Sequence, residues 1–227
     1  MGPTVAIHQP EYFPWPGYLA KARRADVFVL FDQVQFDRSS LQHRAKIANG
    51  PDLVWLTIPF VHRFPQRIDE LAFADARWAQ KHWKSLRACY GRAPGWPAAS
   101  AALEAFFAAS HARVVDAVVA SVTLLFAAFG VTTPVVRASS LPVTGDKGEL
   151  VLGICRHLGA GRYLSGATGA SYLDSAAFAA AGIELTVARY TPPAYPRRQP
   201  AAIPGLSALD AWLELGAGAP AILETAA

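Results

Sequence analysis

Three residues that could take part in acid–base or acyl-transfer chemistry, His8, Asp32 and Ser165, each follow a short apolar segment directly. A histidine can take up a proton, a carboxylate can orient that histidine, and a hydroxyl can bond or attack a carbonyl group. Ser165 is not part of a G-x-S-x-G nucleophile elbow. We therefore expect His8 to act as a general base, or as a hydrogen-bond donor to a phosphate or carbonyl group, rather than as the partner of a serine nucleophile.

The stretch that begins at His8 (HQPEYFPWPGY) is rich in proline and aromatic residues. Rigid loops at the carboxyl end of a buried strand are where α/β proteins place their ligands. Tyr12, Trp15 and Tyr18 could stack on a sugar or a base, and Gln9 could bond its polar groups. Aromatic residues are also good core residues, so an ordinary turn that caps the core is an equally open interpretation.

The elements that must position these residues begin with a strand–helix–strand unit. Residues 5–7 and 27–31 are continuous apolar runs, typical of parallel strands covered on both faces, and a short basic helix is expected at 17–25. The right-handed crossover of such a unit puts the carboxyl ends of both strands on one edge of the sheet. We therefore expect His8 and Asp32 to line one crevice.

The remaining pattern predicts an α/β fold of three layers, with a mainly parallel, Rossmann-like sheet in a single domain of residues 1–227. Further strands are expected at 54–58, 134–139, 162–164 and 183–189, and a helical insertion at about 78–130. The polar segment 33–50 is expected to be a partly ordered insertion over the site, which makes Gln35 and Arg44 candidate ligand contacts. The small-residue loop after Ser165, with Gly166 and Tyr172 nearby, could approach an anion through its backbone. Residues 216–227 are expected to fray in part.

Composition and charge limit the class of protein. The chain has 227 residues with a formal net charge of +4, and no run of lysine or arginine exceeds two residues, so no nucleic-acid footprint is evident. Cys89 and Cys155 are far apart and have no zinc-ligand spacing. No signal peptide is visible, and the most apolar window, 114–131, is interrupted by polar residues. We expect a cytoplasmic protein without a membrane span or a bound metal, and with a small-molecule substrate.

The sequence closely resembles the WbqC-like family, and the resemblance runs through nearly the whole chain in family order. The segments that carry it are His8-Gln9-Pro10-x-Tyr12-Phe13-Pro14-Trp15-x-Gly17-Tyr18, Asp26-Val27-Phe28-Val29, Asp32-x-Val34-Gln35-Phe36, Arg44 with Ile47, Trp55-Leu56-Thr57-Ile58-Pro59, Lys81-His82, Tyr163-Leu164-Ser165-Gly166, Tyr172-Leu173 and Tyr195-Pro196. The chain departs from the family pattern at His43, where asparagine is expected before Arg44.

Members of this family tend to be encoded beside genes for O-antigen, other glycans or specialised metabolites. One activity suggested for the family is the transfer of an amino acid onto an amino sugar. The resemblance therefore implies a transferase that forms an amide by passing an amino acid or other acyl group to an amino sugar or related amine. It also adds His82 to the candidate substrate contacts and implies a nucleotide-linked amino sugar as one substrate, with an acyl carrier protein as one conceivable donor.

Two other functions stay open. A strand, a histidine-containing loop and a short basic helix also resemble the start of nucleotidylyl-transferring folds, in which ATP activates a carboxylate as an adenylate. The paired-histidine motif of those folds is absent, because His8 stands alone. No resident cofactor is expected, but ATP could be a co-substrate. The third interpretation is a non-catalytic protein that binds a sugar nucleotide.

Overall fold

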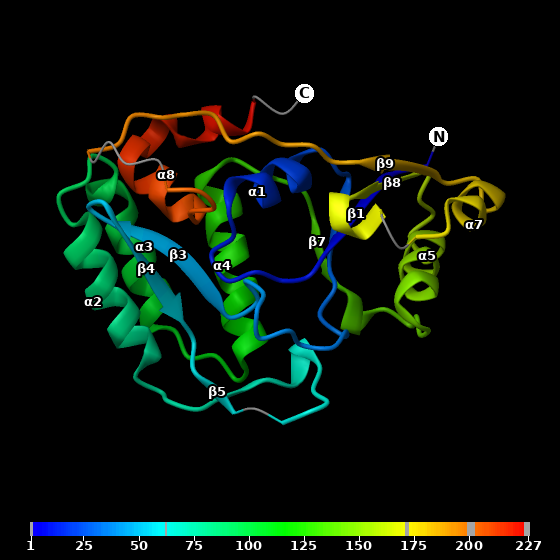
Figure 1. The fold of residues 1–227 in the computed structure, drawn as a ribbon, viewed down its shortest axis with the longest axis horizontal. Coiled ribbons are helices and arrows are strands. Elements are labelled where there is room, and N and C mark those ends of the chain that lie inside the picture. The colour runs from blue at the N-terminus through cyan, green and yellow to red at the C-terminus, as the bar shows by residue number, and fades with distance from the viewer. Residues whose placement is uncertain (1, 62, 171–172, 199–202, 225–227) are drawn as a thin grey trace.

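The computed structural model describes residues 2–61, 63–170, 173–198 and 203–224. At its centre lies a sheet in which every pair of neighbouring strands is parallel. The strands are β1 (Thr4–His8), β2 (Val27–Leu30), β7 (Val135–Arg137), β8 (Arg162–Ser165) and β9 (Glu184–Val187). They lie in the order β7-β2-β1-β8-β9 (Figure 1). The chain adds β2 and β7 on one side of β1 and then β8 and β9 on the other side. The strand order therefore reverses between β1 and β8.

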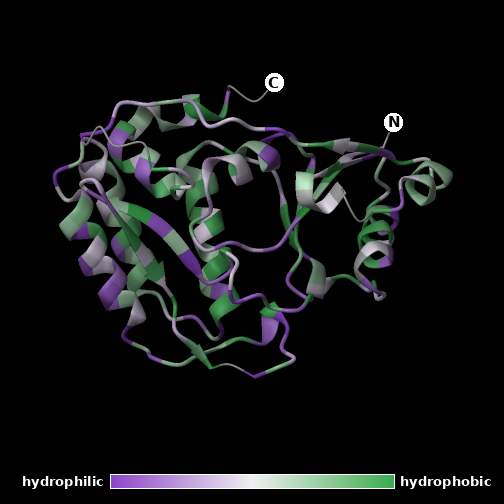
Figure 2. Cartoon of the chain, in the orientation of Figure 1, coloured by the Kyte–Doolittle hydropathy of each residue, from purple (hydrophilic) through white to green (hydrophobic). Residues whose placement is uncertain are grey.

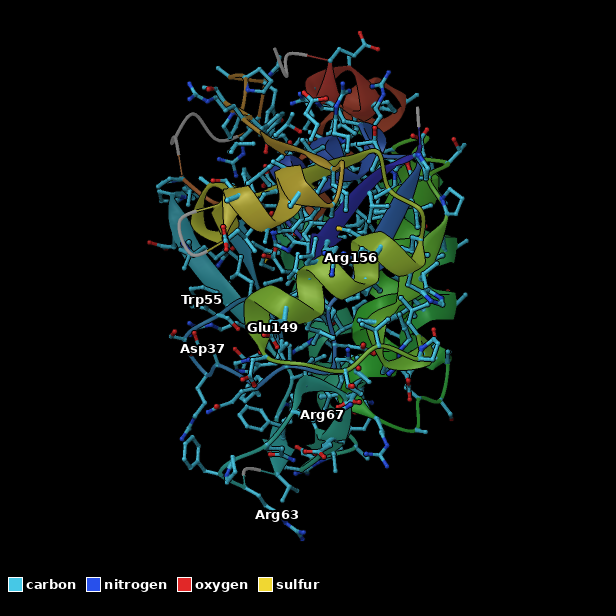
Figure 3. All side chains as sticks on the ribbon, turned by 90° about the vertical axis from the view of Figure 1, so that its right-hand side faces the viewer. Asp37, Trp55, Arg63, Arg67, Glu149 and Arg156 are labelled. Atoms are coloured by element: carbon cyan, nitrogen blue, oxygen red, sulfur yellow. The ribbon has the colours of Figure 1, made fainter. Side chains whose placement is uncertain are left out.

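Alternating side chains of β1 pack against helices on opposite faces of this sheet. Val5 and Ile7 belong to the apolar cluster that includes residues of α5 (Lys147–His157) and α7 (Ser175–Ala180). Ala6 belongs to the larger cluster with residues of α1 (Pro16–Arg23) and α4 (Val114–Ala128). Figure 3 shows α5 across the face turned to the viewer, with Glu149 and Arg156 on it. The predicted three-layer α/β fold with a Rossmann-like parallel sheet is confirmed.

A long excursion of the chain separates β2 from β7. It begins with the antiparallel hairpin β3 (Arg44–Asn49) and β4 (Asp52–Thr57), followed by the short pair β5 (Phe60–Val61) and β6 (Ala72–Phe73). It continues with α2 (Trp78–Tyr90), α3 (Trp96–Ala108) and α4. Residues 44–49, which we expected within a partly ordered insertion, form a regular strand instead, because Ala45, Ile47 and Ala48 are buried in the core.

The helices of this excursion differ in how much polar surface they carry. Figure 2 shows hydrophilic segments on α2 at the edge of the molecule, whereas α4 in the centre is mostly hydrophobic. Within the described ranges, no helix combines the length and the apolar composition that would be needed to cross a membrane.

The C-terminal residues are ordered further than the sequence suggested. Helix α8 (Ala208–Leu215) continues into the 3₁₀ segment Gly216–Leu223. Ala219, Ile222 and Leu223 are buried against the larger apolar cluster. We expected residues 216–227 to fray in part; residues 216–223 are ordered because these apolar side chains complete the core beside α1 and α3, and residues 225–227 lie outside the described residues.

A buried carboxylate on α8 joins this helix to the excursion. Asp210 is fully buried, and its two oxygens accept hydrogen bonds from the hydroxyls of Tyr90 and Tyr195, both at 2.7 Å. Arg197 donates to the same carboxylate from Nε at 2.8 Å and from Nη2 at 2.9 Å. The Tyr90 hydroxyl in turn accepts the backbone N–H of Ala48 at 2.9 Å. One carboxylate therefore connects α8, α2 and β3.

We predict that Asp210→Ala lowers the free energy of unfolding by about 3–5 kcal/mol, because it removes the acceptor for two buried hydroxyls and for the guanidinium of Arg197. Urea denaturation followed by far-UV circular dichroism measures this loss. The control is Asp52→Ala, at an exposed position beside the hairpin turn, which should change the value by less than about 0.5 kcal/mol. Equal effects of the two substitutions would contradict the role given to Asp210.

Candidate functional site

The site lies where the strand order of the sheet reverses. Ligands of open α/β sheets bind outside the carboxyl ends of the strands at such a point. β1 ends at His8 and its neighbour β8 ends at Ser165, while Asp32 follows β2 on the other side of β1. Each of the three residues therefore lies at the carboxyl end of β1 or of a strand that pairs with β1. Their catalytic roles depend on the side-chain contacts described next.

The loop between β1 and α1 is fixed to three distant parts of the chain. The N–H of Tyr12 donates to the carbonyl of Leu41 at 3.0 Å, and the N–H of Phe13 donates to Oγ of Ser121 on α4 at 3.0 Å. The carbonyl of Pro14 accepts the N–H of Ala208 at 2.8 Å. Phe13 has a φ of 40°, in the left-handed region that is strained for a bulky residue. Such strain persists only where the surroundings impose it, and it is frequent at functional sites.

Four titratable side chains meet at the end of β1. Nδ1 of His8 lies 3.9 Å from Oε1 of Glu11, and the ring of His8 packs edge-on against Tyr18 with 4.7 Å between centroids. Lys21 is 5% exposed, and its Nζ donates to the carbonyl of Ile7 at 2.7 Å. We call His8, Glu11, Tyr18 and Lys21 the β1 polar cluster. The side chain of His8 is 28% exposed and that of Glu11 is 13% exposed, so the cluster reaches solvent mainly through His8.

Two polar atoms of the cluster have no protein partner within the described part of the chain. Oε2 of Glu11 and the hydroxyl of Tyr18 are buried and lack a hydrogen-bond partner among the described residues. A buried polar atom left unbonded costs about 1–3 kcal/mol. Native proteins fill such positions with an ordered water or a ligand group, or retain them for function. The β1 polar cluster therefore offers a donor and an acceptor to a bound molecule.

Burial moves the ionisation of the cluster away from ordinary values. Desolvation raises the pKa of Glu11 to about 8, although the nearby ammonium of Lys21 opposes the shift. Desolvation lowers the pKa of Lys21 to about 7, and the Glu11 carboxylate opposes it. Desolvation and the positive charge of Lys21 lower the pKa of His8 to about 3, so its imidazole is neutral near pH 7. Perturbed acids and bases of this kind cluster at functional sites.

The hydrogen bond of His8 fixes which nitrogen can accept a proton. Nδ1 lies 3.1 Å from the carbonyl oxygen of Gln9. A carbonyl oxygen can only accept, so in the neutral ring the hydrogen is assigned to Nδ1. Nε2 then carries the free lone pair and is the nitrogen that can take up a proton from a substrate.

Asp32 is engaged with the neighbouring strand rather than with His8. Its fully buried carboxylate accepts from Arg137 Nε at 2.6 Å, from Ser139 Oγ at 2.8 Å and from the N–H of Ser139 at 2.9 Å. Arg137 also reaches Asp116 on α4 at 3.1 Å. These bonds join the end of β2 to the end of β7. The carboxyl group beside His8 is that of Glu11, and a catalytic role for Asp32 stays a prediction.

Ser165 and its loop are only partly defined. The hydroxyl of Ser165 is buried and donates to the carbonyl of Gly166 at 3.0 Å. A Cβ placed on Gly166 would meet nothing within 4 Å, so a close approach of protein atoms does not require glycine there. Tyr172 lies outside the described residues. The predicted roles of Ser165 and Gly166 stay predictions.

Tyr12 and His82 bond each other inside the core. The hydroxyl of Tyr12 lies 3.0 Å from Nδ1 of His82, and Nε2 of His82 lies 3.2 Å from the carbonyl of Thr57. Nε2 therefore donates to that carbonyl, and Nδ1 accepts from Tyr12. Tyr12 is fully buried and His82 is 6% exposed. Their structural effect is to tie the loop after β1 to α2 and β4.

The other predicted contacts surround the site at different depths. Trp15 is partly buried and packs edge-on against Tyr190, with 5.8 Å between centroids. Gln9 accepts a hydrogen bond from Gln42 at 2.7 Å. Gln35 is exposed, and it forms an isolated bridge with Arg67.

Arg44 lies on the hairpin rather than free over the crevice. Its guanidinium donates to the carbonyls of Ser39 and Ser40, and it stacks on Trp55 at 4.6 Å from the ring centroid. Figure 3 shows Trp55 at the edge of the molecule. These contacts indicate that Arg44 shapes the polar segment before β3.

Glu11 and Lys21 are the residues that the sequence interpretation did not single out. Each has a local signal, because Glu11 follows His8 by three residues and Lys21 follows Tyr18 by three, which places the latter pair on one face of α1. Arg137 and Ser139 have no such signal, since they are more than a hundred residues from Asp32. Among the described residues, no group of three or more His, Cys, Asp or Glu side chains is arranged to hold a metal ion.

The chain matches a family model described as the WbqC-like protein family over residues 9–221, a region that begins directly after His8. A protein of Mycobacterium tuberculosis (strain ATCC 25618 / H37Rv) named "Uncharacterized protein Rv1507c" is 26% identical over 220 residues, covering 95% of each chain. No solved structure matches.

The raised pKa of Glu11 makes the stability of the fold depend on pH, because ionising this buried carboxyl destabilises the folded protein. The pKa of Glu11 is about 8 in the folded protein and about 4.5 in the unfolded chain. Between pH 4.5 and pH 8 the folded protein therefore keeps a proton on Glu11 that the unfolded chain has released. Stability contributed by this group is therefore lost as pH rises from about 4.5 to 8. We predict that the stability of the native protein relative to Glu11→Gln falls by at least ~1 kcal/mol between about pH 5 and pH 7.

Urea denaturation of both proteins over this pH range measures the difference, and the opposing effect of His8 is present in both and cancels. Glu104→Gln, at an exposed position on α3, is the matched control and should show a constant difference from the native protein. A constant difference for Glu11→Gln as well would show that the carboxyl of Glu11 ionises normally.

Proposed function

The chain belongs to the WbqC-like protein family, and from this membership together with the β1 polar cluster we propose that it is a transferase that forms an amide. It passes an amino acid or another acyl group to an amino sugar or related amine, in the biosynthesis of a glycan or a specialised metabolite. The observation that carries the proposal is the cluster itself. Neutral His8, an acid and an amine with pKa values near 7–8, and two unbonded polar atoms lie together at the reversal point of a parallel sheet.

Amide formation needs two proton transfers and hydrogen-bond donors for the developing oxyanion, and the groups of the β1 polar cluster suit all three tasks. The attacking nitrogen becomes acidic as its bond to the carbonyl carbon forms, so even the weakly basic Nε2 of His8 can remove its proton. Protonated Glu11 can return a proton to the leaving group. The hydroxyl of Tyr18 and the ammonium of Lys21 are donors for the negative charge that develops on the carbonyl oxygen.

ATP-dependent activation of a carboxylate is the second candidate, and the strand order supports it. Nucleotides bind at the point where the order of a parallel sheet reverses, and here that point lies between β1 and β8. An adenylate formed in this crevice would supply the acyl group for the same amide. A protein that binds a sugar nucleotide without turnover is the remaining alternative.

Mass spectrometry of amide products tests these functions. The purified protein is given nucleotide-linked amino sugars and a panel of amino acids, with ATP, with a carrier-protein thioester or with neither. A product that requires ATP would support adenylate chemistry, and a product formed only from a thioester would support a plain acyltransferase. Tight binding of a sugar nucleotide with no product in any mixture would favour the non-catalytic protein.

We predict that His8→Ala lowers kcat for amide formation by about 10²–10⁴-fold, the usual contribution of a positioned general base. The unfolding midpoint should stay close to that of the native protein, because the His8 side chain is partly exposed and its hydrogen bond with Gln9 joins it to the adjacent residue. His157→Ala, at an exposed position on α5, is the matched control and should keep full activity. Turnover of His8→Ala at the native rate would remove His8 from the mechanism.

A further inference from the structure

A cavity of about 410 Å³ lies between the turn of the β3–β4 hairpin, the last turn of α2 and residues 197–198. It shares no lining residue with the β1 polar cluster. Its walls carry the side chains of several arginines together with those of Asn49, Cys89 and Glu214; the arginines are Arg87, Arg92, Arg197 and Arg198. Its volume is within the range of small-molecule sites, and it would hold about a dozen waters.

Two of these arginines are neutralised by carboxylates. Arg197 pairs with the buried Asp210, and Arg198 pairs with Glu214 through Nε at 3.1 Å and Nη2 at 3.0 Å. Arg87 and Arg92 are exposed, and their guanidinium groups have no hydrogen bond or ion pair within the described part of the chain. The cavity therefore has an excess of two positive charges at its walls.

One of the lining arginines, Arg198, is held in a fixed orientation. Besides its bonds to Glu214, Arg198 donates from Nη2 to the carbonyl of Cys89 at 3.0 Å, and its guanidinium lies 5.9 Å from the ring centroid of Tyr90. Tyr90 is itself fixed by its bond to Asp210. A preorganised wall of this kind loses little conformational freedom when a ligand binds.

We propose that this arginine-lined cavity is a binding site for a small molecule that carries phosphoryl groups. Guanidinium groups bind phosphate oxygens through paired hydrogen bonds, and Arg87 and Arg92 supply charge that no carboxylate of the described residues balances. A single phosphate ion would leave most of the volume empty, which favours a diphosphate or a phosphate ester with a polar body. The inference does not depend on the reaction assigned to His8.

Isothermal titration calorimetry with inorganic pyrophosphate, inorganic phosphate, uridine diphosphate and citrate tests the site. We expect pyrophosphate or uridine diphosphate to bind more tightly than citrate, and Arg87→Gln/Arg92→Gln to weaken that binding by about tenfold or more. Lys84→Gln removes a charge from an exposed position on α2, the helix that carries Arg87, but outside the cavity, and should change affinity less than about twofold. His8→Ala should bind like the native protein.

Absence of binding, tighter binding of citrate, or unchanged affinity in the double variant would overturn the proposal. If Lys84→Gln weakened the binding of pyrophosphate as much as the double variant does, the proposal would also be overturned. The anion would then be attracted by the overall positive charge of the surface and not by the cavity.

Cys89 provides an independent readout because it lines the cavity, whereas Cys155 is fully buried on the other side of the sheet. Burial raises the pKa of the Cys89 thiol, so alkylation by iodoacetamide is followed at about pH 8.5 and located by peptide mass spectrometry. Saturating pyrophosphate should slow the alkylation of Cys89 several-fold in the native protein and leave it unchanged in the double variant. Alkylation at the same rate with and without pyrophosphate would place the anion elsewhere.

Discussion

The backbone hydrogen bonds that hold the loop after β1 connect it to parts of the chain that are far apart in sequence. Leu41 lies before the hairpin, Ser121 lies on α4, and Ala208 begins α8, yet each bonds one of the consecutive residues Tyr12, Phe13 and Pro14. This convergence imposes the left-handed φ of Phe13. The orientation of Glu11 toward His8 follows from the course of the same loop. A shift of Leu41, Ser121 or Ala208 would therefore change the geometry of the site, although none of these residues belongs to it.

The buried ionisable side chains fall into two groups that differ in how completely they are hydrogen-bonded. Asp32 and Asp210 are fully buried, and each accepts several hydrogen bonds, which include those from an arginine and from at least one hydroxyl group. Such saturated carboxylates join strands and helices and offer nothing to a ligand. Glu11 and Lys21 instead stay incompletely bonded in the interior, and desolvation moves the pKa of each toward neutrality. The contrast in bonding separates the architectural groups from those that can exchange protons.

The two polar regions differ in the chemistry that they can support. The β1 polar cluster is small, largely desolvated and close to neutral, which suits the movement of protons near a carbonyl group. The arginine-lined cavity is wider, open to solvent and positively charged, which suits the recognition of an anion. The aspartate network beneath α8 supports the cavity wall, since Arg197 and Tyr90 both contact Asp210.

The sequence by itself determined the α/β class, the parallel strands and the position of His8 at the end of β1, because apolar runs and their polar terminators are local properties of the chain. It also indicated that His8 and Asp32 follow the two strands of one strand–helix–strand unit, since the crossover connection places both strand ends on one edge. Only the tertiary structure decided that Asp32 bonds Arg137 and that Glu11 and Lys21 accompany His8. Arg137 lies more than a hundred positions from Asp32, and no local pattern encodes such a pairing. Glu11 and Lys21 are close to His8 in sequence, but their desolvation depends on the packing of the whole fold around them.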